Sequence, residues 1–226
     1  MTNKTYALLD NYMLCSMEVA GHDAEHVYRV LYNALLLAEG RQDVDTDVLI
    51  TACLLHDIGR KEQAEDPSLC HAAVGGEKAY RFLLEKGFRE DFARHVKDCI
   101  QTHRFRKNRQ PESTEARLLF DADKLDVTGA IGIARTLAYE AEVGEPLYVK
   151  RSDGSICNGE NTDEPSFFHE YKFKLEGLYG RFYTEKGRQM AESRRRIAAD
   201  FYAALYREVN TGYTEGKQLL TAALEG

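Results

Sequence analysis

An almost wholly apolar segment that ends in a histidine–aspartate pair constrains this chain more than any other feature. The run Val48–Leu55 is followed directly by His56 and Asp57, and Gly59, a residue type that often ends helices, comes two positions later. A helix this apolar should be buried, and an imidazole beside a carboxylate at its inner end costs free energy unless both are satisfied. A divalent metal satisfies both, because it binds a neutral imidazole nitrogen and an ionised carboxylate oxygen together. The pair therefore predicts a buried metal site.

More side chains of metal-binding types lie upstream and downstream of this pair. They are His22, His26, His71, His103, Asp121, Asp123 and Asp126. His22 and His26 are four residues apart, so on one helix they share a face. We expect His26 to be a metal ligand. His22 lies at or before the start of that helix, so we expect it to act from outside the ligand set, by orienting His26 or a metal-bound water.

The acidic stretch 121–126 can be sorted by helix geometry. At 100° per residue, one apolar arc is formed by Leu118, Leu119, Ala122 and Leu125. Asp126 falls within this arc and Asp123 lies on its edge, so both are ligand candidates, whereas Lys124 points away. Asp121 lies on the far edge. We therefore expect Asp121 to be solvated, and its replacement by Asn to leave metal affinity nearly intact.

Two further histidines fit three different roles. His103 continues the inward face of Val96, Cys99 and Ile100, and His71 stands at the expected start of a helix, whose free N–H groups favour anions. The pair fits a second metal site, contacts to a phosphate, or a purely structural role. We place both residues beside the open coordination positions of a single metal ion. Four cations follow His103 closely, and they form either a solvated loop or part of a phosphate pocket.

The rest of the sequence predicts an all-α fold. Apolar residues recur at helical spacing over most of the chain, and no strand pattern is convincing. We expect one domain over residues 1–226, with a helical core over about 20–140, a mobile polar loop at 150–166, and a C-terminal extension of helices over about 167–182 and 184–210.

Composition limits the classes of protein that fit. The 226 residues are 43% apolar and 30% charged, as in globular proteins, and no stretch reaches the roughly 20 apolar residues of a membrane span. The first residues lack the order of a signal peptide, and five widely spaced cysteines favour a reducing cytoplasm. A net charge of −7 makes nucleic acid an unlikely partner. The chain is compatible with a homodimer.

At this point the ordered residues resemble a known family. The order His26, His56-Asp57, Asp123 is similar to the signature of the HD-domain superfamily of metal-dependent phosphohydrolases. Longer matches to one subfamily of small bacterial HD hydrolases lie at 22–30, 55–59, 121–135 and 174–194. The resemblance covers about residues 20–207, and the block Asp121 to Arg135 is its most specific part. It implies a single helical HD bundle, in which Asp123, rather than Asp126, is the fourth metal ligand.

The resemblance implies hydrolysis of a phosphoester or phosphoanhydride, in substrates from nucleoside monophosphates to triphosphates, including release of pyrophosphate. His26, His56, Asp57 and Asp123 would hold Mn²⁺, Mg²⁺, Fe²⁺, Co²⁺ or Zn²⁺ and leave positions open for water and a phosphate oxygen. Asp126 joins His22 outside the ligand set. Besides Asp57, the catalytic candidates are His71, His103 and Glu62, which could act as general base or as a hydrogen-bond acceptor outside the ligand set. The candidate phosphate contacts are Arg29, Arg60, Lys61, His71, His103 and Arg135.

Two other classes remain open. Some proteins of this fold use two metals for oxidative cleavage of carbon bonds, and His71 and His103 would then supply a second iron site. The third class is a nucleotide or metal sensor that binds without turnover.

Overall fold

The structure is a computed structural model that describes residues 1–17, 24–104 and 109–225. Within these ranges it is helical, and the one β pairing is an isolated bridge between Lys150 and Ile156. This confirms the expected all-α class. The chain forms two compact units, residues 1–126 with 182–187 and residues 127–181 with 188–226. No helix in the described ranges is long and apolar enough to cross a membrane.

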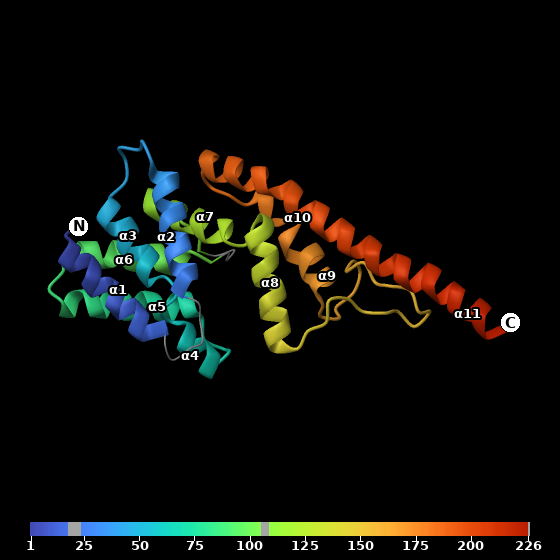
Figure 1. The fold of residues 1–226 in the computed structure, drawn as a ribbon. Coiled ribbons are helices and arrows are strands. Elements are labelled where there is room, and N and C mark those ends of the chain that lie inside the picture. Colours follow the sequence, from blue (N-terminus) through green and yellow to red (C-terminus); the bar gives the residue numbers. More distant parts are fainter. Residues whose placement is uncertain (18–23, 105–108, 226) are drawn as a thin grey trace. The chain divides into compact units, whose positions relative to one another are not determined.

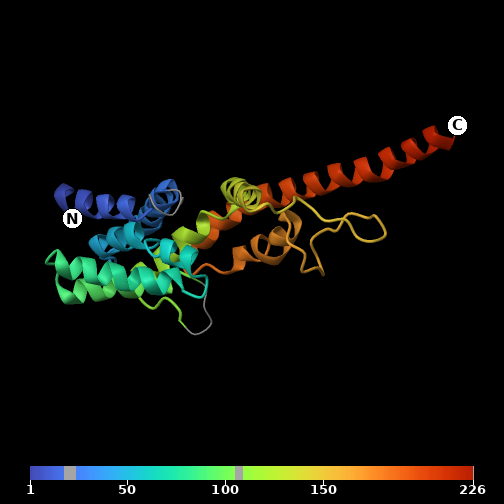
Figure 2. The same ribbon diagram turned by 90° about the horizontal axis from the view of Figure 1, so that it is seen from below.

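The first unit consists of seven helices within its described residues (Figures 1 and 2). They are α1 (Asn3–Met17), α2 (Ala24–Ala38), α3 (Thr46–Leu55), α4 (Arg60–Glu65), α5 (His71–Glu85), α6 (Glu90–Thr102) and α7 (Thr114–Leu125). The apolar helix α3 lies at the centre and packs against α1, α2, α6 and α7, while α5 runs along α6. Helix α1 lies ahead of the core predicted for residues 20–140.

Side-chain caps set where two of these helices begin. The Asp45 carboxylate accepts hydrogen bonds from the backbone N–H groups of Asp47 and Val48, at 3.0 and 3.1 Å, and so caps α3. The Ser113 hydroxyl accepts from the N–H of Ala116 at 3.1 Å and caps α7. The residues that directly follow the two helices, His56 after α3 and Asp126 after α7, belong to the histidine–aspartate cluster described below.

A close backbone contact joins the end of α3 to the start of α5. A Cβ atom added to Gly59 would lie 2.3 Å from the carbonyl oxygen of His71 and 2.6 Å from the backbone nitrogen of Gly75. Glycine is therefore required at position 59, because the two backbone segments approach each other so closely. This contact brings the His56-Asp57 pair next to His71.

The second unit is built around helix α8 (Gly129–Val143) and the C-terminal helices. Residues 150–166 contain neither a helix nor an extended strand, as expected, and their mobility stays a prediction. The predicted helix over 167–182 is broken into α9 (Phe167–Glu170), a π-helical turn η1 (Tyr171–Leu175) and a 3₁₀ turn η2 (Leu178–Gly180). Helix α10 (Glu185–Thr211) starts in the first unit and runs through the π turn η3 (Gly212–Gly216) into α11 (Lys217–Glu225) (Figure 2).

Aromatic rings form much of the core of the second unit. Tyr171 and Tyr202 stack with ring centroids 4.2 Å apart, and Phe168 meets Tyr202 edge-on at 5.5 Å. Such contacts hold the short α9–η1 segment against α10.

Candidate metal centre

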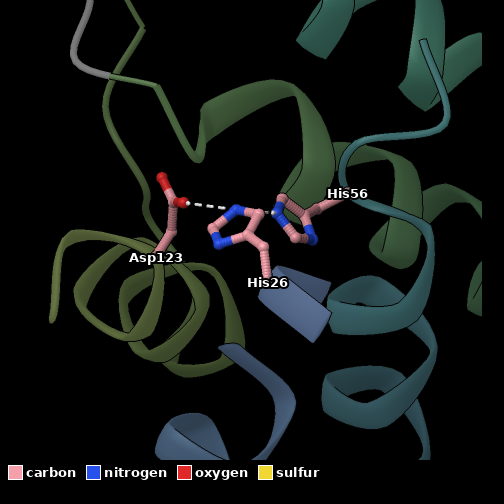
Figure 3. Close-up of side chains that lie close together, drawn as sticks. All are labelled: His26, His56 and Asp123. Carbon is pink, nitrogen blue, oxygen red and sulfur yellow. Dashed lines mark hydrogen bonds and ion pairs between the residues drawn. The ribbon is translucent and has the colours of Figure 1, made fainter. Parts of the chain in front are cut away.

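Six side chains far apart in the sequence form two adjacent groups of potential metal ligands. One group is His26, His56 and Asp123, and the other is Asp57, His71 and His103; in each, the ligand atoms all lie within 4.8 Å of one another. Figure 3 shows the first group, in which the ring of His26 lies between Asp123 and His56. The structure thus brings all four predicted metal ligands together with the two additional histidines.

Five helices supply these residues. His26 lies in the first turn of α2, His56 and Asp57 follow the last residue of α3, and His71 is the first residue of α5. His103 follows directly after α6, and Asp123 lies in the last turn of α7. Because the groups come from helix ends and first turns, the site is assembled where these five helices meet inside one unit.

Each of the four histidines is oriented through its Nδ1 atom. The partners of these nitrogens are, for His26, His56, His71 and His103 in turn, the Asp126 carboxylate, the Cys53 carbonyl oxygen, Gln63 Oε1 and the Ile100 carbonyl oxygen. All four partners are acceptors, so each Nδ1 carries the proton and donates it. The Nε2 atoms are then the metal-binding atoms, and all of them face the cluster.

The second group brings three acceptors together. His71 Nε2 lies 3.3 Å from His103 Nε2, and Asp57 Oδ1 lies 3.4 Å from the first and 3.7 Å from the second. Burial lowers the pKa of His71 to about 2 and that of His103 to about 3, so both rings are neutral. Among the described residues, Asp57 Oδ1 is buried without a hydrogen-bond partner. Three lone pairs facing one another in a buried site require a cation or a proton donor, and a metal ion therefore fits this group.

In the first group, a proton on His26 Nε2 occupies the position where a cation would bind. His26 Nε2 lies 3.4 Å from both Asp123 Oδ1 and His56 Nε2, and 3.6 Å from Asp57 Oδ2. Burial lowers the pKa of His26, but hydrogen bonds with Asp123 and Asp126 outweigh it and raise the pKa to about 9. Burial lowers the pKa of His56. A divalent ion bound here would replace the Nε2 proton of His26.

Asp57 connects the two groups, because Oδ2 faces the first and Oδ1 faces the second. Burial raises the pKa of Asp57, but the attraction of the carboxylate to its polar neighbours, among them the charged guanidinium of Arg60, outweighs this effect and holds the pKa below its usual range. Arg60 Nε lies 3.0 Å from Asp57 Oδ2. The carboxylate is therefore ionised and suited to bridge two cations.

Asp126 lies behind His26, away from the ligand atoms. Its Oδ2 accepts from His26 Nδ1 at 2.7 Å, and Arg29 Nε donates to its Oδ1 at 2.7 Å. This is the geometry of a carboxylate that orients a metal-binding histidine. Arg29, a predicted phosphate contact, is bound to Asp126 in this structure.

The other predicted residues are distributed differently. Glu62 belongs to neither group of ligands; its carboxylate accepts from Lys78 Nζ at 2.6 Å, and this ion pair lowers its pKa against the effect of burial. Lys61 pairs with Glu65 at 3.8 Å on the exposed side of α4. Arg135 lies on α8 in the second unit, His22 lies outside the described residues, and so do Arg106 and Lys107.

Two expectations for α7 are wrong. Asp121, expected to be solvated, is fully buried, and its carboxylate accepts hydrogen bonds from residues 183 and 184. The apolar arc counted only residues of α7, whereas residues 182–187 cover the opposite face. Lys124, expected to point away, donates to Asp123 Oδ2 at 2.7 Å and lies over the Phe120 ring. Gln63, the partner of His71, was also missed, and no local pattern marks it.

Comparisons with known proteins relate both the sequence and the fold of this chain to HD-domain proteins. Residues 23–128 match the family model of the HD domain. The uncharacterized Bacillus subtilis protein YpgQ is 29% identical over 196 residues, which are 85% of this chain and 86% of YpgQ. Its crystal structure in complex with ADP has a TM-score of 0.69 at 24% identity, over 90% of this chain and 97% of that one. An HD-superfamily hydrolase from Bacillus thuringiensis has a TM-score of 0.68 at 29% identity, over 92% of this chain and 97% of that one.

The match of residues 23–128 to the HD-domain model confirms the resemblance, and the chain has the fold of HD-superfamily hydrolases. All six candidate ligands fall within the matched residues.

Proposed function

We propose that this protein is a divalent-metal-dependent phosphohydrolase that acts on a phosphoester or phosphoanhydride bond of a nucleotide. The observation that carries the proposal is the arrangement of His26, His56, Asp57 and Asp123, whose ligand atoms converge while the Nδ1 proton of each histidine is held elsewhere. Two imidazoles and two carboxylates leave coordination positions free for water and a phosphate oxygen. The fold of HD-superfamily hydrolases supports the same class of reaction.

The chain's own residues prepare the site for a divalent ion and a phosphate group. A bound divalent ion supplies Lewis acidity and lowers the pKa of water. Asp126 fixes the orientation of His26, and Asp57, kept ionised by its neighbours, presents both oxygens to the interior of the cluster. Arg60, beside Asp57 and partly exposed, is the best placed of the predicted phosphate contacts. Glu62 keeps its predicted role as a proton acceptor, with the ion pair to Lys78 holding it ionised.

The substrate class rests on one relative. YpgQ has been crystallised with ADP, and its sequence matches most of this chain. We therefore propose a nucleotide as the substrate. Identification of the reaction products distinguishes phosphatase from pyrophosphatase action.

A nucleotide screen after metal removal and add-back tests the function. Wild type should lose activity with a chelator and regain it with one of the ions Mn²⁺, Mg²⁺, Fe²⁺, Co²⁺ or Zn²⁺. His56→Ala should lose both metal and activity while its circular-dichroism spectrum stays helical. His95→Gln is the matched control, because His95 lies beside Glu115, at 3.1 Å, and in neither ligand group. Full metal content and full activity in His56→Ala would refute the proposal.

A second ion at Asp57, His71 and His103 is a further candidate, and it departs from the single ion expected from the sequence. The neutral rings of His71 and His103 already donate their Nδ1 protons, so their Nε2 atoms present lone pairs and would need a further proton to donate to a phosphate oxygen. A cation would satisfy the Nε2 lone pairs of both rings better than a phosphate oxygen would. Elemental analysis decides: two ions per wild-type chain and one in His103→Ala support a two-ion centre, and one ion in both proteins supports the single-ion site.

The same geometry keeps the oxidative reaction as the second candidate function, since two ions bridged by Asp57 would suit a di-iron centre. Turnover that requires oxygen, together with a mixed-valent spectroscopic signal, would favour it over hydrolysis. Nucleotide binding at one equivalent without turnover for any of the ions would favour a sensor.

A further inference from the structure

We infer that Asp121 is a positioning residue: by binding residues 182–187 on the back of α7, it holds the last turn of this helix so that Asp123 is placed for the metal. The inference rests on the proposed metal centre. It gives a function to a buried carboxylate that takes no part in the ligand groups.

The contact of Asp121 with the later segment is extensive. Asp121 Oδ1 accepts from the backbone N–H of Tyr183 at 2.8 Å. Asp121 Oδ2 accepts from the N–H of Thr184 at 2.7 Å and from its hydroxyl at 2.6 Å. Hydrogen bonds to an ionised acceptor are stronger than those between neutral groups. Three of them on one fully buried carboxylate make a firm anchor between segments 62 residues apart.

The start of α10 completes the anchor. The Thr184 hydroxyl donates to Asp121 and accepts from the N–H of Gly187 at 3.0 Å, so it caps α10 while bound to α7. A negative carboxylate at the start of a helix is also favoured by the helix dipole. A Cβ atom on Gly187 would lie 2.5 Å from Asp121 Oδ2. Residue 187 must therefore be glycine for the carboxylate to lie this close.

Helix geometry places this anchor opposite the metal ligand. At 100° per residue, Asp121 and Asp123 point about 160° apart around the axis of α7. On the ligand side, Asp123 Oδ1 faces His26, and Asp126 is bound to both His26 and Arg29. The last turn of α7 is therefore held on two opposite sides, by α2 and by residues 182–187.

The position of Asp123 in the helix explains why such support matters. It lies in the last turn of α7, which ends at Leu125 and is closed by the N–H of Asp126, a donor to the carbonyl oxygens of Asp123 and Lys124. Ends of helices open more readily than their middles. A metal site needs its ligands within about 0.5 Å of their productive positions, so fraying or rotation of this turn would weaken binding without removing any ligand.

Direct metal titration of two variants tests the inference. In Asp121→Asn, the amide NH₂ group replaces one acceptor and faces an N–H donor. Thr184→Val keeps the side-chain volume and removes the two hydrogen bonds of the hydroxyl, the one donated to Asp121 and the one accepted from the N–H of Gly187. We expect Asp121→Asn to weaken Mn²⁺ binding on the order of tenfold, the scale seen for groups that orient metal ligands, and Thr184→Val to weaken it less. The Co²⁺ absorption spectrum of both should change, because the ligand geometry changes.

The control separates positioning from general stability. Ser113→Ala removes the cap at the far end of the same helix, where Ser113 accepts from the N–H of Ala116. It should lower thermal stability and leave both the Mn²⁺ affinity and the Co²⁺ spectrum of the folded protein unchanged. If Asp121→Asn does not fold, Thr184→Val decides. Wild-type affinity and spectrum in the folded variants, or an equal loss in Ser113→Ala, would overturn the inference and leave the proposed function intact. A wild-type protein that binds no divalent ion would overturn both.

Discussion

Replacement of Gly59 by alanine should move the second group of candidate ligands away from the first. Gly59 has φ −95° and ψ 4°, a conformation that alanine tolerates, so any effect must come from space rather than backbone strain. The added Cβ would lie 2.3 Å from the His71 carbonyl oxygen and 3.0 Å from the Gly75 Cα. Both neighbours are backbone atoms, which cannot rotate away.

The size of the effect follows from these distances. An ordinary contact of a Cβ atom begins at 3.4 Å, so the start of α5 must move by about 1 Å. Overpacking of a close contact costs about 1–3 kcal/mol, and we expect Gly59→Ala to lie at the upper end because the obstruction is backbone. A shift of this size would carry His71 away from Asp57, whose atoms are now 3.4 Å apart. The second ligand group should be damaged more than the first.

Chemical denaturation and elemental analysis measure the two effects. Gly76→Ala is the matched control, at the next residue after Gly75 on α5, because the three atoms nearest to its Cβ would all belong to the Gln101 side chain, which can move. Alanine is favoured over glycine inside a helix by about 1 kcal/mol, so the control should be neutral or stabilising. If Gly59→Ala keeps both the unfolding free energy and the metal content of wild type, the contact between α3 and α5 does not set the site.

Three further outcomes follow from other groups. Asp126→Asn should weaken metal binding about 10-fold to 100-fold in a calorimetric titration, because it perturbs the hydrogen bond that orients His26; unchanged affinity would exclude that role. Burial, with Glu145 and Glu170, raises the pKa of Glu140 to about 7, so its contribution to stability is present below about pH 4.5 and is lost as the pH rises through 7. Glu140→Gln should therefore gain stability over wild type, on the order of 1–3 kcal/mol, between pH 5 and 8, and a pH-independent difference would contradict this. A thiol reagent should modify exposed Cys15 rapidly and the buried cysteines of the core only on unfolding, as mass spectrometry of native protein would show.

The candidate metal ligands could be picked out of the sequence because their signal is local. The His56-Asp57 pair directly follows a buried apolar helix, and the helical spacing that turns His103 inward is visible within α6. A polar group on a buried face must be satisfied wherever its partner comes from, so sequence alone marks it as a ligand candidate. The grouping of these residues into two sets that share Asp57 was not predictable, because it depends on how the five helix ends meet.

Asp121 shows why the remaining features escaped the sequence. A helical wheel assigns burial from the apolar residues of one helix, and by that measure Asp121 belonged to the solvated side of α7. The groups that bury it are two backbone N–H groups and a hydroxyl from residues 183 and 184. Backbone donors are common to nearly all residue types, so their presence leaves no mark in the sequence. A carboxylate next to a metal ligand can thus be read as solvent-facing on its own helix, while the fold uses it to hold that ligand in place from behind.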